Sequence, residues 1–422
     1  MTKKFIHNVN IKSRAKSNQI KKQSLIPSDK QIRELLNGSK NLKLEKKELE
    51  LASNNLLSNI LNSSKSLENY NEIKTQLGFL YDNLKGIFDF AKVPMEYRDR
   101  KFINKTGCAI SPANAITSIN DVFRVSGFIR AIDLAIKDLK VTFKNKPLHI
   151  LYPACGPLAP LLLPLLVYYN SNNIYSFKDI KITFIDIQQG SIIALVNLIK
   201  ILQLDSYVKD IKCIDGVDYK TDEDIHLVIL EAMQHGFTRE GHLSIAKHFS
   251  NMLHKDGIFL PQNITISSFL AIADEEFNTQ FKDKEFASSF TRDEKIQNKR
   301  IQLGKILEVN LDSLKNMKVI ELDTNTKLIK CATHTIPYFK ENEKQYIMLF
   351  ATNIHIYKNE YIDEYDSGIT HPLPDLNICI NFIPKNDKRE SDLYIKSADK
   401  ITFYYKLIGM PGFLVTKGSN NE

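Results

Sequence analysis

The chain has 422 residues, 43% of them hydrophobic, and a formal net charge of +8 at pH 7, which predicts about two to three domains and a sizeable core. Residues 1–50 hold thirteen Lys/Arg against five Asp/Glu, so the rest of the chain is close to neutral. Because this basic arm has no interleaved aromatic residues and no recognised nucleic-acid motif, we interpret it as a solvated leader, and we do not expect a nucleic-acid partner.

The cysteines and the apolar runs indicate in which cellular compartment the protein is expected. The five cysteines lie far apart and form no Cys-x-x-Cys pair, which argues against a disulfide framework or structural metal and favours a reducing compartment. The longest apolar run, 158–169, has twelve residues and two prolines, too few to span a bilayer. No apolar core follows the basic N-terminus, so no secretory signal is expected. The sequence predicts a soluble, cytoplasmic protein without a membrane partner or a bound metal.

The N-terminal third is expected to be helical after a flexible basic leader over 1–28. Residues 29–104 carry apolar residues at three-to-four spacing, the pattern of amphipathic helices. A further helical stretch over 105–140 begins where Ser111 could cap the helix and Pro112 suits its first turn.

From Pro147 onward, short branched apolar runs alternate with helical segments. This alternation predicts a parallel sheet covered by helices, a Rossmann-like α/β domain over 105–262. After the fourth run we expect a helix, a Lys-Asp-Gly turn and a fifth strand. The first four expected strands are 148–154, 180–187, 208–215 and 225–232.

The C-terminal region, 263–422, shows the period-two alternation of antiparallel strands. It predicts a sandwich or a barrel-like domain, interrupted by a polar helical insertion near 274–310. The insertion could serve as a dimerisation arm, so a homodimer is one assembly that the sequence allows.

Polar residues follow three of the predicted parallel strands. Gly156 lies in a turn that opens a helix, Asp186 ends the second strand and Asp215 ends the third. A carboxylate at the second position suits the hydroxyls of a ribose, and one at the third can accept from an adenine amino group. These strand ends predict a nucleoside-binding site.

The same geometry would serve a NAD-binding oxidoreductase. Against that alternative, Pro157 and Leu158 replace the glycines that allow a pyrophosphate to approach. A nucleoside ligand without a pyrophosphate, such as S-adenosylmethionine, is easier to fit.

The segment "LEAMQHGFTRE", 230–240, contains a glutamate, Glu231, directly after the fourth strand and a second, Glu240, nine positions later. A guanidinium group is planar and permanently charged, and carboxylates match it through paired hydrogen bonds. Two carboxylates facing one cation would lower its desolvation cost and orient its nitrogen. As alternatives, Glu231 could be a simple strand-end acid and Glu240 an acid at a helix N-terminus.

From about Ile110 to Leu373 the sequence resembles the protein arginine methyltransferases, S-adenosylmethionine enzymes of class I with an appended β-barrel. The segments that carry the resemblance are "INDVFR", "ILYPACG" with "FIDI", "LEAMQHGFTRE" and "ITHPL". The resemblance implies a Rossmann-like methyltransferase domain, S-adenosyl-L-methionine as cofactor, and a nitrogen acceptor oriented by a double-glutamate loop. The first 100 residues show no resemblance that we can name.

The resemblance also implies roles for individual residues. Arg124 would clamp the carboxylate of the cofactor, alongside Gly156, Asp186 and Asp215. Asp121 and His371 would pair beside the acceptor pocket, where an Asp–His contact can take up a proton. Such a pair predicts hydrogen-bonding reach between the two side chains and a raised pKa for His371.

Three departures from the family pattern concern mainly the acceptor. The glycine loop has lost two glycines, Gln234 follows Met233 where a glycine is usual, and Pro372 replaces a tryptophan. We therefore expect a guanidino or amino acceptor in a peptide, protein or small molecule. The alternatives are a same-fold methyltransferase for a small metabolite or biosynthetic intermediate, and a cofactor-binding scaffold without turnover.

Overall fold

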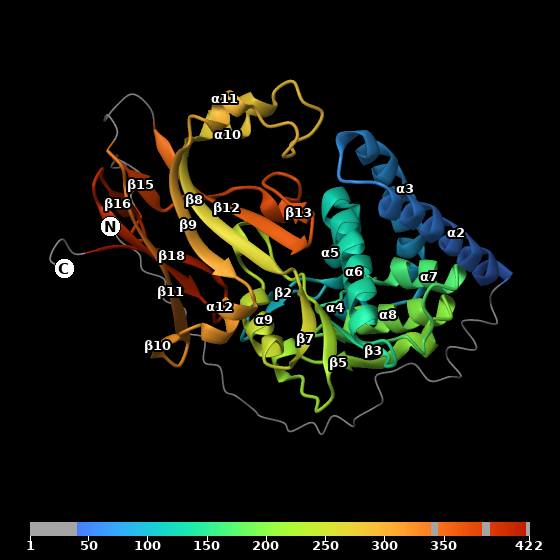
Figure 1. The fold of residues 1–422 in the computed structure, drawn as a ribbon. Helices are drawn as coiled ribbons and strands as arrows, with labels where there is room; N and C mark the ends of the chain where they lie inside the picture. The colour runs from blue at the N-terminus through green and yellow to red at the C-terminus, as the bar shows by residue number, and fades with distance from the viewer. Residues whose placement is uncertain (1–39, 339–344, 382–388, 419–422) are drawn as a thin grey trace, which may run out of the picture.

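The computed structural model describes residues 40–338, 345–381 and 389–418. The leader predicted over 1–28, and the first part of the helical region that follows it, lie outside these residues. A parallel sheet with its helices forms one half of the molecule, and antiparallel sheets form the C-terminal half (Figure 1). The predicted α/β class is thereby confirmed.

Five parallel strands form the central sheet in the order β5-β4-β3-β6-β7. Every residue of β3, the first strand of this sheet along the chain, is buried, because helices cover both faces. The chain goes from β3 to one side of the sheet and later returns to the other side at β6. Ligands of open α/β sheets bind beside the carboxyl ends of the strands at such a reversal. The strands are β3 (Leu148–Pro153), β4 (Ile180–Asp186), β5 (Val208–Cys213), β6 (Ile225–Ile229) and β7 (Leu253–Leu260).

The Lys-Asp-Gly segment does not form the predicted turn but lies within β7. Leu253 pairs with Ile225, whereas Ile258 pairs with Leu227, so the register shifts between these two pairs. The extra residues of β7 form a bulge in the strand. A bulge leaves residues unpaired, and the Lys-Asp-Gly segment can therefore lie inside a strand.

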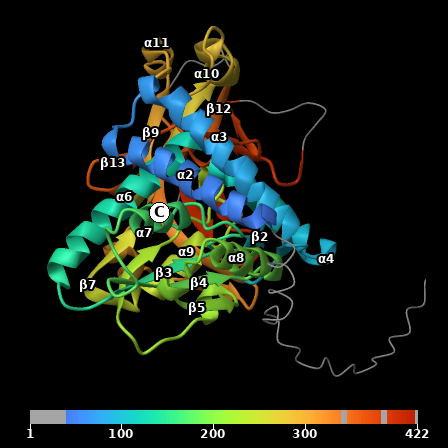
Figure 2. The same cartoon turned by 90° about the vertical axis from the view of Figure 1, so that its right-hand side faces the viewer.

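Two long helices, α2 (Lys40–Asn62) and α3 (Leu67–Phe90), lie across the helices of the parallel sheet (Figure 2). Ser66 caps α3 by accepting a hydrogen bond from the backbone N–H of Asn69 at 3.3 Å. This helix is predictable from the sequence because its buried face carries apolar residues at helical spacing. These residues are Ile73, Leu77, Leu80, Leu84 and Ile87. This face packs on α6 (Val122–Thr142), α8 (Gln189–Ile201) and η1 (Ile116–Asn120), while α2 packs on α7 (Leu163–Ser171).

A short segment connects these helices to α6. It comprises α4 (Met95–Arg98), the hairpin of β1 (Phe102–Ile103) and β2 (Cys108–Ala109), and α5 (Pro112–Ala115). Ser111 caps α5, and Pro112 occupies its first turn, as predicted.

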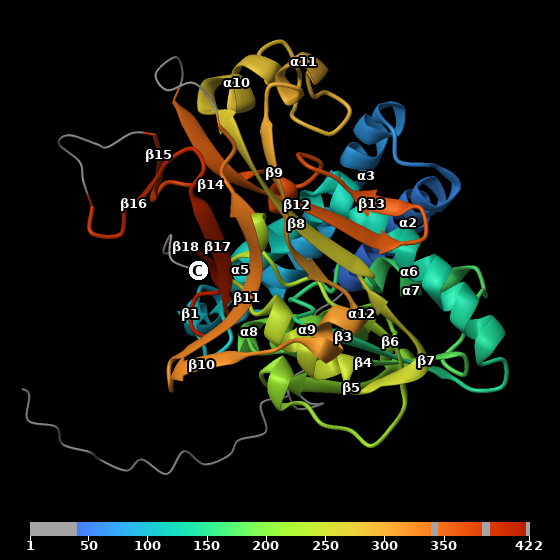
Figure 3. The ribbon, with the colours of Figure 1, turned by 60° about the vertical axis from the view of Figure 1, so that its left-hand side comes forward.

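The C-terminal half contains two larger antiparallel sheets, β10-β11-β17-β18 and β13-β12-β8-β9, with β14 paired to β12 (Figure 3). The structure thus shows separate antiparallel sheets among the described residues of this region. The bounds are β8 (Asn263–Ile272), β9 (Ile301–Val309), β10 (Ile320–Asp323), β11 (Thr326–Thr335), β12 (Tyr346–Tyr357), β13 (Glu360–Ile362), β14 (Leu373–Asp375), β15 (Ile378–Ile380), β16 (Leu393–Ile395), β17 (Lys400–Lys406) and β18 (Gly412–Lys417).

The helical insertion is shorter than predicted. Its helices are α10 (Ala273–Phe277), η5 (Thr279–Phe281) and α11 (Glu294–Gln297). Residues from Ile301 to Val309, expected inside the insertion, form β9 instead. They pair with β8, and this long-range pairing overrides the polar composition that favoured a helix.

Candidate functional site

A cavity of about 330 Å³ lies at the carboxyl ends of the parallel strands, and this volume is at the lower end of ordinary ligand sites. Six residues predicted for the site line this cavity: Arg124, Gly156, Asp186, Asp215, Glu231 and Glu240. Four of them lie at or just after strand ends, Arg124 lies on α6 and Glu240 lies in the loop before residue 242, so only the folded chain brings them together. The other two predicted residues, Asp121 and His371, are not among those that line it.

The turn after β3 is tied to the end of β4. The backbone N–H of Gly156 donates to Asp186 Oδ2 at 2.9 Å, and the N–H of Gln188 donates to Asp186 Oδ1 at 2.7 Å. Gly156 has a φ of +67°, which favours glycine. Burial raises the pKa of Asp186 to about 6, although both backbone donors act to lower it.

Asp215 is held by the β1–β2 hairpin. Its Oδ2 accepts from Asn104 Nδ2 at 2.8 Å and from Thr106 Oγ1 at 3.4 Å, and its Oδ1 accepts from the N–H of Val217 at 3.2 Å. The carboxylate faces the cavity but already has three donors. It positions the hairpin over the strand end as well as offering an acceptor for a ligand.

Arg124 and Glu231 form an ion pair through Arg124 Nη2 and Glu231 Oε2. The Glu231 side chain is 5% exposed and that of Arg124 is 16% exposed, so the pair is desolvated and depends on its geometry. Burial raises the pKa of Glu231, while Arg124 counteracts this rise. Within the described part of the chain, Glu231 Oε1 and Arg124 Nε have no hydrogen-bond partner, so each retains capacity for a ligand.

Glu240 has a different environment. Its Oε1 accepts from Gln234 Nε2 at 3.1 Å, with no ion pair in the described structure. Burial, and secondarily the charge of Glu231, raises the pKa of Glu240 to about 7. One carboxyl group is therefore held beside a cation, and the other exchanges its proton near neutral pH.

The predicted pairing of Asp121 with His371 is wrong in its direct form. Asp121 Oδ2 accepts from Ser367 Oγ at 2.5 Å and from the N–H of Gly368 at 3.3 Å. His371 is half-buried against the Tyr365 ring, at 5.1 Å between centroids. Burial lowers the pKa of His371, and the charge of Asp121, which would raise it, does not compensate. Ser367 and the backbone N–H of Gly368 occupy the acceptor oxygen of Asp121, and His371 is therefore not its hydrogen-bond partner.

Sequence reasoning did not identify three polar residues that organise the site. Gln188 Nε2 donates to the carbonyl oxygens of Arg100 at 2.7 Å and Ile110 at 2.8 Å, which fixes the segment before α5 over the end of β4. Gln234 holds Glu240, and Asn104 holds Asp215. An amide directly after a strand-end acid, as in "DIQ", is the sequence signal that could have indicated Gln188.

No cluster of three or more His, Cys, Asp or Glu side chains in the described residues has an arrangement suited to a metal ion. None of the helices described combines the length and apolarity needed to cross a bilayer.

No protein-family model and no curated protein sequence matches this chain. Among solved structures, it is similar to a Trypanosoma brucei PRMT1 enzyme–prozyme heterotetrameric complex with AdoHcy. The identity is 11% over 73% of this chain and 94% of that chain, with a TM-score of 0.40. It is also similar to protein arginine methyltransferase 10 of Arabidopsis thaliana in an open conformation, at 12% identity over 70% of this chain and 87% of that chain, with a TM-score of 0.40. No family membership follows from these values.

Proposed function

We propose that the protein is an S-adenosylmethionine-dependent methyltransferase acting on a guanidino or amino nitrogen. The observation that carries the proposal is the presence of two carboxyl groups, the buried Glu231 and the half-buried Glu240, in the cavity that also contains Gly156 and Asp186. Buried acids without full compensation are costly. Acids with such perturbed pKa values in a cleft commonly mark a functional site. Here they would bind a cationic acceptor beside the nucleoside.

The residues present fit the cofactor at several points. Asp186 would accept from the ribose hydroxyls, and Gly156 leaves open space, since a Cβ added there would meet no atom within 4 Å. Arg124 keeps a buried Nε that could bind a carboxylate. When bound, S-adenosylmethionine supplies an electrophilic methyl group on a sulfonium.

The chain's own residues would bind and orient the acceptor. Arg124 holds one oxygen of Glu231, leaving Oε1 free to accept from the acceptor nitrogen. A cation entering the cavity would lower the pKa of Glu240 and complete a two-carboxylate clamp. Such a displacement is accelerated mainly by holding the acceptor nitrogen in line with the bond between the methyl group and the sulfur.

The test is methyl-group transfer from labelled S-adenosylmethionine, with arginine-containing peptides and with cell extract separated into protein and small-molecule fractions. We expect label in the protein or peptide fraction and its loss with Glu240→Gln. Label confined to small molecules would instead assign the enzyme to a metabolite or biosynthetic intermediate. Cofactor binding by calorimetry with no label in any fraction would contradict turnover and leave a binding scaffold.

A second measurement separates the two acceptor chemistries. An amine must lose its proton before it attacks, and its ordinary pKa is about 10.4, whereas a guanidinium group stays charged to above about 12. With an amine acceptor, the rate should continue to rise well above pH 8. With a guanidino acceptor held by carboxylates, the profile should level off once Glu240 is ionised.

A further inference from the structure

The turn between α2 and α3 contacts a distant segment of the C-terminal half. Lys65 Nζ forms an ion pair with Asp363 Oδ2 at 2.8 Å and another with Asp366 Oδ2. The Lys65 side chain is 17% exposed and that of Asp366 is fully buried. Lys65 Nζ also lies over the rings of Phe123, at 5.7 Å, and Phe290, at 5.6 Å. A lysine enclosed in this way is a fixed contact rather than a solvated surface charge.

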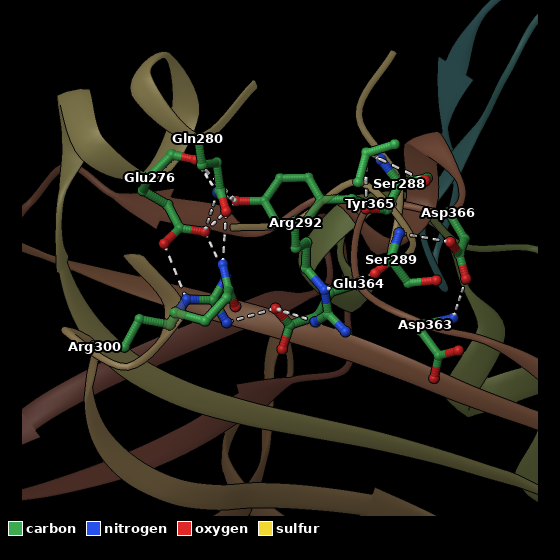
Figure 4. Close-up of polar contacts among 12 residues, drawn as sticks. Glu276, Gln280, Ser288, Ser289, Arg292, Arg300, Asp363, Glu364, Tyr365 and Asp366 are labelled. Atoms are coloured by element: carbon green, nitrogen blue, oxygen red, sulfur yellow. Dashed lines mark hydrogen bonds and ion pairs between the residues drawn. The ribbon is translucent and has the colours of Figure 1, made fainter. Parts of the chain in front are cut away.

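The segment that Lys65 holds is fixed on its other side by the insertion. Figure 4 shows Glu364, Tyr365 and Asp366 facing residues of the insertion. Asp366 Oδ1 accepts from the N–H of Ser289 at 2.9 Å, and Glu364 Oε2 accepts from Arg300 Nη1 at 2.7 Å. Among the described residues, Lys65 is the cation paired with Asp366. The buried charge of Asp366 therefore depends on the N-terminal helices.

The next residues of this segment connect it to the cavity. Ser367 Oγ donates to Asp121 Oδ2 at 2.5 Å, and Asp121 Oδ1 caps α6 by accepting from the N–H of Arg124 at 3.4 Å. Arg124 is the residue that pairs with Glu231. A continuous series of contacts thus runs from the α2–α3 turn to a carboxylate in the cavity.

We propose that Lys65 is a positioning residue, through which the N-terminal helices fix the start of α6 and the direction of the Arg124 side chain. Without its cation, the buried Asp366 carboxylate would draw the 363–368 segment toward solvent. Ser367 would then release Asp121, and the first turn of α6 would lose its fixed orientation. The consequence for the cofactor and the acceptor rests on the proposed function, but the effect on α6 does not.

The experiment compares Lys65→Met and Lys65→Arg in the full chain. Lys46→Met is the matched control, because Lys46 lies on α2 and donates to Gln203 at an exposed site. Amide hydrogen exchange should become faster by about tenfold or more over 121–126 and 363–368 in Lys65→Met, since local openings follow local contacts. We expect wild-type exchange in Lys65→Arg and Lys46→Met.

Binding of S-adenosylmethionine by calorimetry gives a second readout. Its Kd should rise about tenfold or more in Lys65→Met, because displaced binding groups lose their alignment. We expect recovery in Lys65→Arg.

Two outcomes would overturn the proposal. One is unchanged exchange over 121–126 in Lys65→Met. The other is faster exchange spread evenly over the whole chain, which would make Lys65 a general stabilising contact. If the wild-type protein fails to bind the cofactor, the proposed function fails, and the exchange pattern still decides whether Lys65 positions α6.

Discussion

The two glutamates of the 230–240 segment show how one cavity gives similar side chains different properties. Glu231 shares its buried site with Arg124, which opposes the rise in its pKa. Glu240 has the amide of Gln234 as its partner, and burial raises its pKa to about 7. Carboxyl groups held in different environments commonly divide their roles. In the proposed function, Glu231 would be the pre-aligned acceptor of hydrogen bonds, and Glu240 the group that a bound cation would ionise.

Glu240 should therefore set the pH dependence of catalysis. In the free protein its proton is lost as pH rises through about 7, so kcat/KM for the acceptor should rise over that range and then level off. Glu240→Gln keeps the shape but removes the charge, and should lower kcat/KM by about a hundredfold, or ~3 kcal/mol. Steady-state kinetics between pH 5.5 and 9 would measure both, with cofactor affinity as the control. An unchanged rate in the variant would refute the carboxylate clamp.

Asp186 should determine cofactor affinity. Two charge-assisted hydrogen bonds to a ribose contribute roughly 3–6 kcal/mol, so Asp186→Ala should abolish measurable binding of S-adenosylmethionine. Asp186 also closes the Gly156 turn, and a folded variant must be verified by circular dichroism. Asp210→Ala, which removes a carboxylate paired with Lys212 on the neighbouring strand, is the matched control. Calorimetry that finds wild-type affinity in folded Asp186→Ala would rule out the ribose role.

Among the elements, the β1–β2 hairpin joins the two ends of the cavity. Its Asn104 holds Asp215, and the N–H of Cys108 donates to the carbonyl of Arg239 at 2.7 Å, directly before Glu240. The hairpin approaches so closely at Gly107 that a Cβ there would lie 2.6 Å from the backbone nitrogen of Gly241. This short hairpin thus fixes the backbone of the double-glutamate segment.

Gly107→Ala should displace the hairpin from that segment. Because the atoms it would meet belong to the backbone, the clash cannot be relieved by rotating a side chain, and we expect a loss of about 1–3 kcal/mol in the free energy of unfolding. Gly78→Ala on α3 is the control, since a Cβ there meets nothing within 4 Å, and alanine should stabilise that helix by up to about 1 kcal/mol. Denaturant unfolding tests both. Equal stability of the two variants would show that the hairpin accommodates the methyl group.

The elements that could be predicted from the sequence are those with a clear local pattern. The strands β3, β4 and β6 are short runs of mostly apolar residues, and α3 has a regular apolar stripe. The strand β9 could not be predicted, because its existence depends on pairing with β8. The cavity was predictable because strand ends of a parallel sheet converge by geometry. The ion pair of Arg124 with Glu231 joins residues 107 positions apart, and its formation depends on the placement of α6.

At the scale of the whole molecule, two sets of buried titratable groups act on stability in opposite directions. Burial lowers the pKa of His149 to about 4 and that of His242 to about 3. Burial raises the pKa of Asp186 to about 6 and that of Glu240 to about 7. Between about pH 4 and 6.5 the unfolded chain binds more protons at these histidines, so their effect favours stability as pH rises. The folded chain binds more protons at the two acids, so their effect reduces stability over about pH 4 to 7.

A substitution of His242 would measure the effect of a buried histidine on stability separately from that of the acids. His242 begins α9 (His242–Ser250), is 1% exposed, and its ring lies 5.4 Å from that of Phe237. Its Nδ1 has no partner in the described structure, so a phenylalanine of similar shape would remove a buried polar atom and add an aromatic contact. With a folded pKa of about 3 against an ordinary value near 6.5, the wild-type protein should lose stability at this position as pH falls below about 6.5.

We therefore expect His242→Phe to be more stable than the wild type by an amount that grows as pH falls. At pH 4 the titration should add on the order of 3 kcal/mol to the difference, since each pKa unit corresponds to about 1.4 kcal/mol. Above about pH 7 the difference should be constant, because His242 is then neutral in both folded and unfolded chains. Urea unfolding of the two proteins between pH 4 and 8 measures this difference, in which the opposing effects of Asp186 and Glu240 cancel. A difference that does not change with pH would mean that His242 is not held neutral by its burial.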